Sequence, residues 1–133
     1  MNKIRKQGLK VAKFGGTSLA DAAQVLKVCA IARADPARRI IVVSAPGKRS
    51  KDDIKVTDLL IACAESKLKG GTAAKELQAV VGRFAVIQKA TGVSDKIVKE
   101  IENDLKKRLA SDMTHRGRFM DCLKAAGEAN GAR

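Results

Sequence analysis

The sequence contains very few aromatic residues and a single histidine. Phe14, Phe84 and Phe119 are its only aromatic residues in a chain of 133, and they lie far apart. Single-stranded nucleic acid is bound on neighbouring aromatic rings, so a stacking platform of that kind is excluded. With His115 as the only histidine, a zinc site is not expected, and we predict no metal ligands in this chain.

Cysteines and long apolar runs are also scarce. Cys29, Cys63 and Cys122 are widely spaced, and each lies in a helical pattern, which favours buried thiols over disulfide bonds. No run of about 18 apolar residues is present, so we expect neither a transmembrane helix nor a membrane partner. The basic residues 1–10 are not followed by the hydrophobic segment of a secretory signal, so we expect a cytoplasmic protein.

Acidic residues are few relative to basic ones. The chain has 27 lysines and arginines against 14 acidic residues, a formal net charge of +13, which is typical of nucleic-acid-binding proteins. The positive side chains are nevertheless scattered along the chain, which favours solvated faces over one binding surface. Nucleic acid is therefore not the expected partner. A basic, non-catalytic module that binds nucleic acid or a partner chain remains the alternative.

The hydrophobic pattern predicts one α/β domain, and the 45% apolar content is sufficient for a core. Apolar runs at residues 9–14 and 39–44 predict strands that are buried, as in a parallel sheet covered on both faces. Helical spacing predicts helices over residues 19–33, 57–70, 72–92, 94–109 and 116–126. A sheet of two strands is marginal alone, so we expect its missing neighbours to come from later sequence or from a second chain.

Two glycines separate the first predicted strand from the first predicted helix. They belong to the run Lys13-Phe14-Gly15-Gly16-Thr17-Ser18, and we call residues 15–18 the glycine turn. Glycines allow close approach of the backbone to an anion, the N–H groups at a helix start point toward it, and a lysine adds positive charge. This combination predicts a site for a nucleotide or an acyl phosphate, although two glycines after a strand can also form only a turn.

Three motifs of the chain resemble the aspartate kinases, which are members of the amino acid kinase family. Lys13 with the glycine turn is similar to the opening motif of that family. Residues 40–45 and 56–60 are similar to its second strand and the helix that follows, and residues 127–133 to its Gly-Glu segment at the amino acid site. The resemblance implies a carbamate kinase-like, parallel-sheet three-layer sandwich. Residues 1–133 would be its amino-terminal, substrate-binding part, without the nucleotide-binding half and the regulatory ACT domains.

The resemblance also implies a reaction. Aspartate kinases transfer a phosphoryl group from ATP to the side-chain carboxylate of L-aspartate, the first step of lysine, threonine and methionine biosynthesis. ATP, L-aspartate and Mg²⁺ bound through the nucleotide are thus the implied ligands, and a homo-oligomer is implied for the full-length protein. The alternatives within the superfamily are N-acetylglutamate, glutamate and uridylate kinases, against which Thr17 and Ser18 favour aspartate. We expect the chain by itself to be inactive.

The implied phosphate site is centred on Lys13, the catalytic cation on the transferring phosphoryl group. The ATP phosphates would contact Lys13, Gly15, Gly16, Thr17, Ser18 and Ser44. Plain structural roles remain open for three of these residues. Lys13 could be a strand-end lysine with its stem on apolar surface, Ser18 an N-cap, and Ser44 only the end of a strand.

The implied aspartate site consists of Thr57 and Glu128. The carboxylate of Glu128 would lie opposite the α-ammonium group of the substrate, which is a charge-assisted contact. The alternatives are a simple N-cap for Thr57 and a solvated helix residue for Glu128. Between the motifs, residues 45–55 form a polar segment that we call the basic loop, and it is longer than expected for many aspartate kinases.

Overall fold

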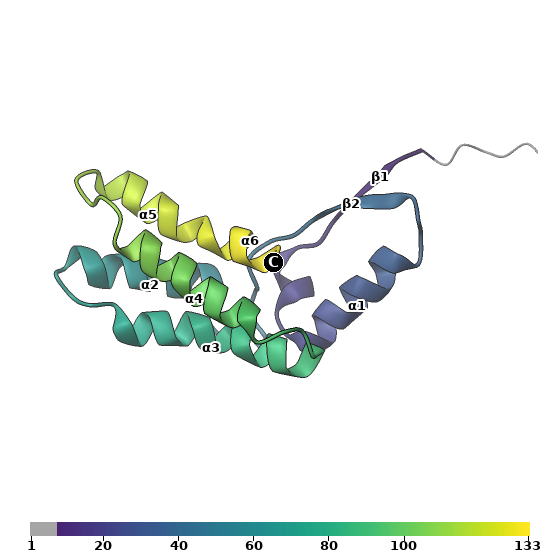
Figure 1. Ribbon diagram of the computed structural model, residues 1–133, viewed down its shortest axis with the longest axis horizontal. Coiled ribbons are helices and arrows are strands. Elements are labelled where there is room, and N and C mark those ends of the chain that lie inside the picture. The colour runs from purple at the N-terminus through teal and green to yellow at the C-terminus, as the bar shows by residue number, and fades with distance from the viewer. Residues whose placement is uncertain (1–7) are drawn as a thin grey trace, which may run out of the picture.

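The computed structural model describes residues 8–133 as two strands and a set of helices (Figure 1). Helices α2 to α5 pack side by side in one lobe, while β1, β2 and α1 form a smaller lobe beside it. Among the described residues, no helix combines the length and the apolar character needed to cross a bilayer. In chain order the elements are β1 (Lys10–Lys13), the 3-10 helix η1 (Gly16–Leu19), α1 (Ala22–Arg33), β2 (Arg38–Val42), α2 (Val56–Leu68), α3 (Ala74–Thr91), α4 (Lys96–Leu109), α5 (Arg116–Lys124) and α6 (Ala126–Gly131).

The two strands pair in parallel and are joined by α1, so the predicted strand–helix–strand unit is confirmed. Helix α1 starts after Asp21, whose carboxylate accepts a hydrogen bond of 2.9 Å from the amide of Gln24. The expectation that Ser18 caps this helix is therefore wrong. Ser18 lies inside η1, and its amide donates to the carbonyl of Gly15 at 3.0 Å. The chain makes this tight turn first, and Asp21 then supplies the cap.

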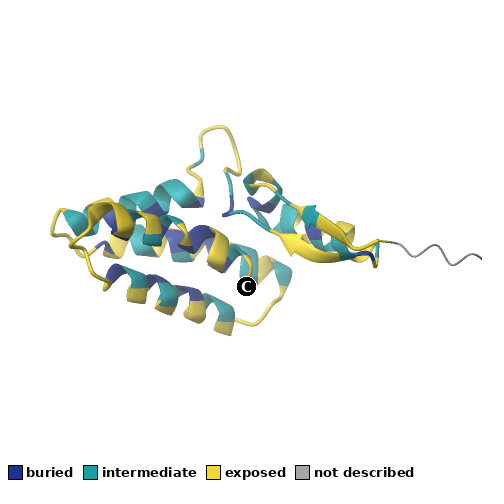
Figure 2. Ribbon diagram, turned by 90° about the horizontal axis from the view of Figure 1, so that it is seen from above, coloured by how far each residue is buried: buried dark blue, intermediate teal, exposed yellow. Residues whose placement is uncertain are grey.

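The strands are not buried, contrary to the expectation from their composition. Val11 is 61% exposed and its partner Ile40 is 46% exposed, and Figure 2 shows both strands mostly in the colour of exposed residues. Apolar residues on consecutive positions are typical of parallel strands with layers on both faces. Within residues 8–133, α1 is the helix that packs on the sheet, against β2, so much of that cover is missing.

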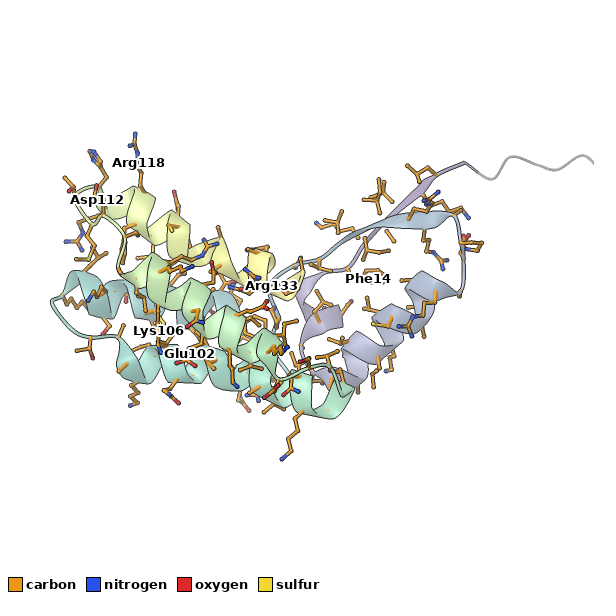
Figure 3. The ribbon with its side chains drawn as sticks, in the orientation of Figure 1. Phe14, Glu102, Lys106, Asp112, Arg118 and Arg133 are labelled. Carbon is orange, nitrogen blue, oxygen red and sulfur yellow. The ribbon has the colours of Figure 1, made fainter. Side chains whose placement is uncertain are left out.

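The hydrophobic core lies in the helical lobe. Its largest fully buried side chains include Phe119, Leu60 and Leu105, which come from three different helices. The predicted apolar stripe of α4 is confirmed, because Ile101, Leu105 and Leu109 are all buried. Another side of α4 carries charge pairs one turn apart, such as Glu102 and Lys106 at 2.6 Å, both labelled in Figure 3.

Two helix boundaries bear on the site. Helix α3 ends at Thr91, close to its predicted end, and Gly92 is its C-cap, where a φ of 74° suits glycine and the amide donates to the carbonyl of Gln88 at 3.0 Å. The last predicted helix, over residues 116–126, corresponds to α5, which ends at Lys124, and a further short helix, α6, follows it from Ala126. The Gly-Glu segment at residues 127–128 is therefore helical, because it belongs to α6.

Candidate active site

The glycine turn and the basic loop contact each other beyond the carboxyl ends of β1 and β2, where ligands of parallel sheets bind. The amide of Gly47 donates to the carbonyl of Gly16 at 2.7 Å. A Cβ atom on Gly47 would lie 2.6 Å from the carbonyl carbon of Gly16, and one on Gly16 would lie 2.9 Å from the carbonyl oxygen of Ala45. Glycine is required at both positions because the two backbones touch.

Helix α6 packs against the same loop. A Cβ atom on Gly127 would lie 2.6 Å from the Cβ of Ala45, and one on Gly131 would lie 3.0 Å from the carbonyl oxygen of Ser44. These small residues let the helix approach the loop at backbone distance. The three sequence motifs, separated by up to about a hundred residues, therefore meet around Ala45.

The phosphate-site candidates line the open side of the glycine turn. Lys13 is exposed at the end of β1, and Gly15 and Thr17 are exposed as well. Nothing lies within 4 Å of the position that a Cβ of Gly15 would occupy, so an anion can reach the backbone there. Ser18 is half-buried and its amide is already bonded to Gly15, which leaves only its hydroxyl for a ligand.

The two aspartate-site candidates lie on different helices. Thr57 is the second residue of α2 and is half-buried, whereas Lys55 is the N-cap, so the N-cap alternative for Thr57 is wrong. The amide of Val56 donates to the carbonyl of Pro46 at 3.0 Å, which ties the start of α2 to the basic loop. Glu128 is exposed on α6. Within residues 8–133, the hydrogen bonds and ion pairs join neither side chain to the other or to Lys13.

Arg83 of α3 is a buried arginine, 6% exposed, that was not among the site residues predicted from the sequence. Its Nη1 donates to the carbonyl of Ile54 at 2.7 Å, and its Nη2 donates to the carbonyls of Gly47 at 2.8 Å and Ala20 at 3.3 Å. The available signal was its position in the stripe of α3, one residue before Phe84, where an apolar side chain is expected.

Two more charged groups close the basic loop. The carboxylate of Asp53 accepts hydrogen bonds from the Arg49 guanidinium at 2.8 Å and lies 3.3 Å from Nη1 of Arg83. The hydrogen bonds from Arg49 hold the pKa of Asp53 well below its ordinary value of 3.8. Burial, together with repulsion from Arg49, lowers the pKa of Arg83, and Asp53 opposes that shift.

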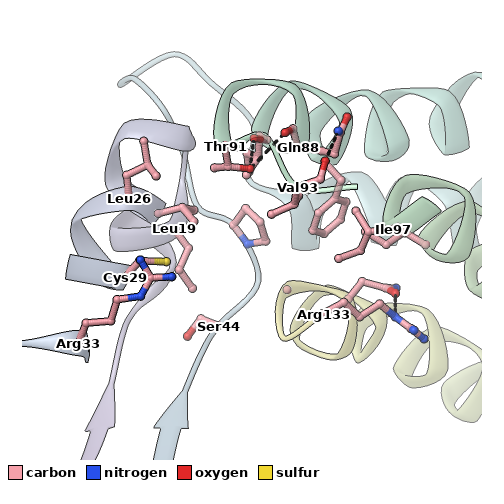
Figure 4. A pocket seen from close by; sticks show the side chains of 17 residues that line it. Leu19, Leu26, Cys29, Arg33, Ser44, Gln88, Thr91, Val93, Ile97 and Arg133 are labelled. Carbon is pink, nitrogen blue, oxygen red and sulfur yellow. Dashed lines mark hydrogen bonds between the residues drawn. The ribbon is translucent and has the colours of Figure 1, made fainter. Parts of the chain in front are cut away.

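A cavity of about 420 Å³ lies between α1, the carboxyl end of α3, α4 and α6 (Figure 4). Its lining is mostly apolar, with Leu19, Ile87 and Ile97 among the lining residues. Of the predicted site residues only Ser44 lines it, so the cavity is adjacent to the phosphate-site candidates but distinct from them.

Comparisons with known proteins agree with the three motifs, although no family model matches the chain. Aspartokinase 3 of Bacillus subtilis (strain 168) is 47% identical over 125 residues, which are 94% of this chain and 28% of that protein. The crystal structure of Clostridium acetobutylicum aspartate kinase superimposes with a TM-score of 0.75 at 28% identity, over 90% of this chain and 26% of that one. Escherichia coli aspartokinase III in complex with aspartate and ADP gives a TM-score of 0.70 at 28% identity, over 92% of this chain and 27% of that one.

These relatives show which part of a known protein this chain resembles. The chain spans about a quarter of the length of each of them. Its helix-rich fold with a small parallel sheet is that of a partial α/β amino acid kinase fold. The resemblance inferred from the motifs is therefore confirmed: over nearly its whole length, in sequence and in fold, this chain is similar to one part of an aspartate kinase.

Proposed function

We propose that residues 1–133 are the substrate-binding, amino-terminal part of an aspartate kinase domain. The parent protein transfers the terminal phosphoryl group of ATP to the side-chain carboxylate of L-aspartate and forms 4-phospho-L-aspartate. The observation that carries this proposal is the meeting of the glycine turn, the basic loop and the Gly-Glu helix around Ala45. The 47% identity to aspartokinase 3 supports the choice of reaction.

The chemistry requires positive charge and hydrogen-bond donors. An ionised carboxylate is already a nucleophile, so no base has to remove a proton, and the site must bring two anions together. Lys13 neutralises charge on the transferring phosphoryl group, while the open backbone at Gly15 and the hydroxyls of Thr17 and Ser18 contact the phosphates. Ser44, just beyond the end of β2, makes a further contact with the phosphates.

The aspartate substrate is proposed to lie between α2 and α6. Thr57 donates a hydrogen bond from the first turn of α2, and Glu128 pairs with the α-ammonium group of the substrate. Glu128 is exposed and therefore accessible to a ligand. The complex of E. coli aspartokinase III with aspartate and ADP is consistent with this pair of ligands.

Mg²⁺ accompanies the nucleotide in this proposal. The backbone N–H of Gly15 and the ammonium group of the exposed Lys13 suit phosphate oxygens, and neither group is an oxygen ligand of the kind that Mg²⁺ prefers. The ion would therefore be held through ATP, where it neutralises charge on the phosphates.

The chain alone is proposed to be inactive, since it spans only about a quarter of its relatives. The test is to mix it with the part of B. subtilis aspartokinase 3 that it does not match, and to measure aspartate-dependent release of ADP. The matching segment of that relative serves as the positive control for assembly. Activity of the mixture with aspartate, and not with glutamate, is expected. A mixture that assembles and turns over another acceptor contradicts the proposed substrate.

Lys13→Ala tests the catalytic residue in the same mixture. Loss of one charge that stabilises the transition state is expected to lower kcat by about 10²–10³-fold. Lys10→Ala is the matched control, because Lys10 lies on the same strand and pairs with Asp35 at 2.7 Å on the surface. Equal activities of the two variants would contradict the role of Lys13.

A further inference from the structure

Arg83 is the only buried charged residue of α3, and the proposed chemistry does not use its charge. A buried guanidinium is costly unless every donor finds a partner, and replacing such a group by an apolar side chain is often neutral or stabilising. Arg83 occupies a position in the stripe of α3 that borders the core residue Phe84. Simple packing therefore does not account for an arginine at this position.

The partners of Arg83 all come from the segments around the glycine turn. Its guanidinium bonds to the carbonyl of Ala20, which follows η1, and to the carbonyls of Gly47 and Ile54, near the two ends of the basic loop. It also lies 3.3 Å from the Asp53 carboxylate. One side chain on a rigid helix thus fixes both ends of the loop and the end of η1.

Gly47 connects this cluster to the proposed phosphate site. Its carbonyl accepts from Arg83 at 2.8 Å, and its amide donates to Gly16 at 2.7 Å. The two backbones are so close that a Cβ on Gly47 would lie 2.6 Å from Gly16. A displacement of Gly47 would therefore displace the glycine turn.

We propose that Arg83 is a positioning residue that holds the glycine turn, through Gly47, in the geometry that receives the phosphates. The inference rests on the proposed function, because the role of the glycine turn as the phosphate site is part of it. Arg83 itself does not touch the ligand. Asp53 assists by pairing with Arg83 and by binding Arg49, which closes the loop.

The experiment compares Arg83→Met with Arg108→Met in the 133-residue chain. Arg108 is a matched control because it also pairs with an aspartate, Asp104 at 2.8 Å, and bonds a backbone carbonyl, that of Cys122 at 2.7 Å, but it lies on α4. Both variants lose one positive charge. Inorganic tripolyphosphate is titrated in, and the amide resonances of residues 15–18 are followed together with the exchange rate of the Gly47 amide.

Arg83→Met is expected to speed exchange at Gly47 and to weaken tripolyphosphate binding by about tenfold or more, because a misplaced turn loses several contacts at once. Arg108→Met is expected to leave both readouts near those of the unmodified chain. Asp53→Asn is the second variant, with a smaller effect in the same direction, and it replaces Arg83→Met if that protein does not fold.

Two results would overturn the proposal. The first is unchanged exchange at Gly47 in Arg83→Met, since the turn is then held without the arginine. The second is faster exchange with unchanged tripolyphosphate binding, which makes Arg83 structural only. If the unmodified chain shows no tripolyphosphate shifts at residues 15–18, the phosphate role of the turn fails, and the exchange rates still decide whether Arg83 holds it.

Discussion

Gly47 and Gly16 are packed so closely that neither position has room for a side chain. Gly47→Ala is expected to lower the free energy of unfolding by about 1–3 kcal/mol, because the added methyl group meets fixed backbone atoms. Gly82→Ala is the control: it lies on α3 with nothing within 4 Å of the new methyl group, and it should stabilise the helix by up to about 1 kcal/mol. Urea titrations followed by circular dichroism measure both changes. Similar shifts in the two variants would contradict the packing argument.

The three free cysteines should differ in reactivity. Cys63 is fully buried in the core, and burial raises the pKa of its thiol to about 11, whereas Cys29 and Cys122 are half-buried. Only the thiolate is nucleophilic, so Cys63 should resist iodoacetamide at pH 8 in the folded chain. Mass spectrometry of alkylated peptides measures this, with alkylation in urea as the control. Labelling of Cys63 as fast as Cys29 under native conditions is the contrary result.

The conformation of the basic loop should depend on pH, because hydrogen bonds to the Asp53 carboxylate hold it. The pKa of Asp53 is lowered by the hydrogen bonds from Arg49, so its contribution to stability is complete above the ordinary value of 3.8 and is lost as the pH falls below it. The amide of Arg49, which donates to Asp53 at 2.9 Å, should keep its chemical shift from pH 7 to about pH 4 and change only below that. Asp53→Asn should abolish the change. A midpoint above 3.8 in the unmodified chain would contradict the pairing.

The main elements could be predicted from the sequence because their signals are local. The stripe of α4, the glycine at the end of α3 and the two apolar strands need only neighbouring residues to be recognised. The tight turn η1 was not predicted, and the prediction that Ser18 is the cap was wrong, since Ser18 and Asp21 are both acceptable caps and only the path of the chain after the glycines decides between them.

Of the candidate site, only the residues that belong to one of the three sequence motifs could be predicted. The closeness of Gly16, Gly47 and Gly127 depends on tertiary packing, and no spacing in the sequence encodes it. Arg83 was missed for the same reason: its three carbonyl partners are up to 63 residues away, so an arginine in an apolar stripe was the only local sign. The exposure of the strands follows from how little of the helical structure packs on the sheet, which the composition of the strands does not determine.

The two lobes of the molecule should differ in local stability. The core of large buried side chains lies in α2 to α6, while Val11, Ile40 and Val42 on the strands are exposed. Amide exchange is slow where opening must break a core, so amides of α2 and α5 should exchange far more slowly than those of β1 and β2. Mass spectrometry of exchanging peptides at neutral pH measures the difference. Adding the unmatched part of aspartokinase 3 should protect the strands, and strands already as protected as α2 in the isolated chain would contradict this view.

The order of the helices along the chain also bears on how the larger lobe folds during synthesis. Helices α2 and α3 are consecutive in the chain and pack on each other, as do α3 and α4, so part of this lobe joins segments that are near in sequence, whereas α2 also packs on α5 from much further along the chain. Contacts between consecutive helices form quickly, whereas the packing of α5 on α2 has to wait until the segments between them have been made. During synthesis on the ribosome α2, α3 and α4 are therefore expected to associate as they emerge, and the core of the lobe is expected to close only once α5 has left the exit tunnel.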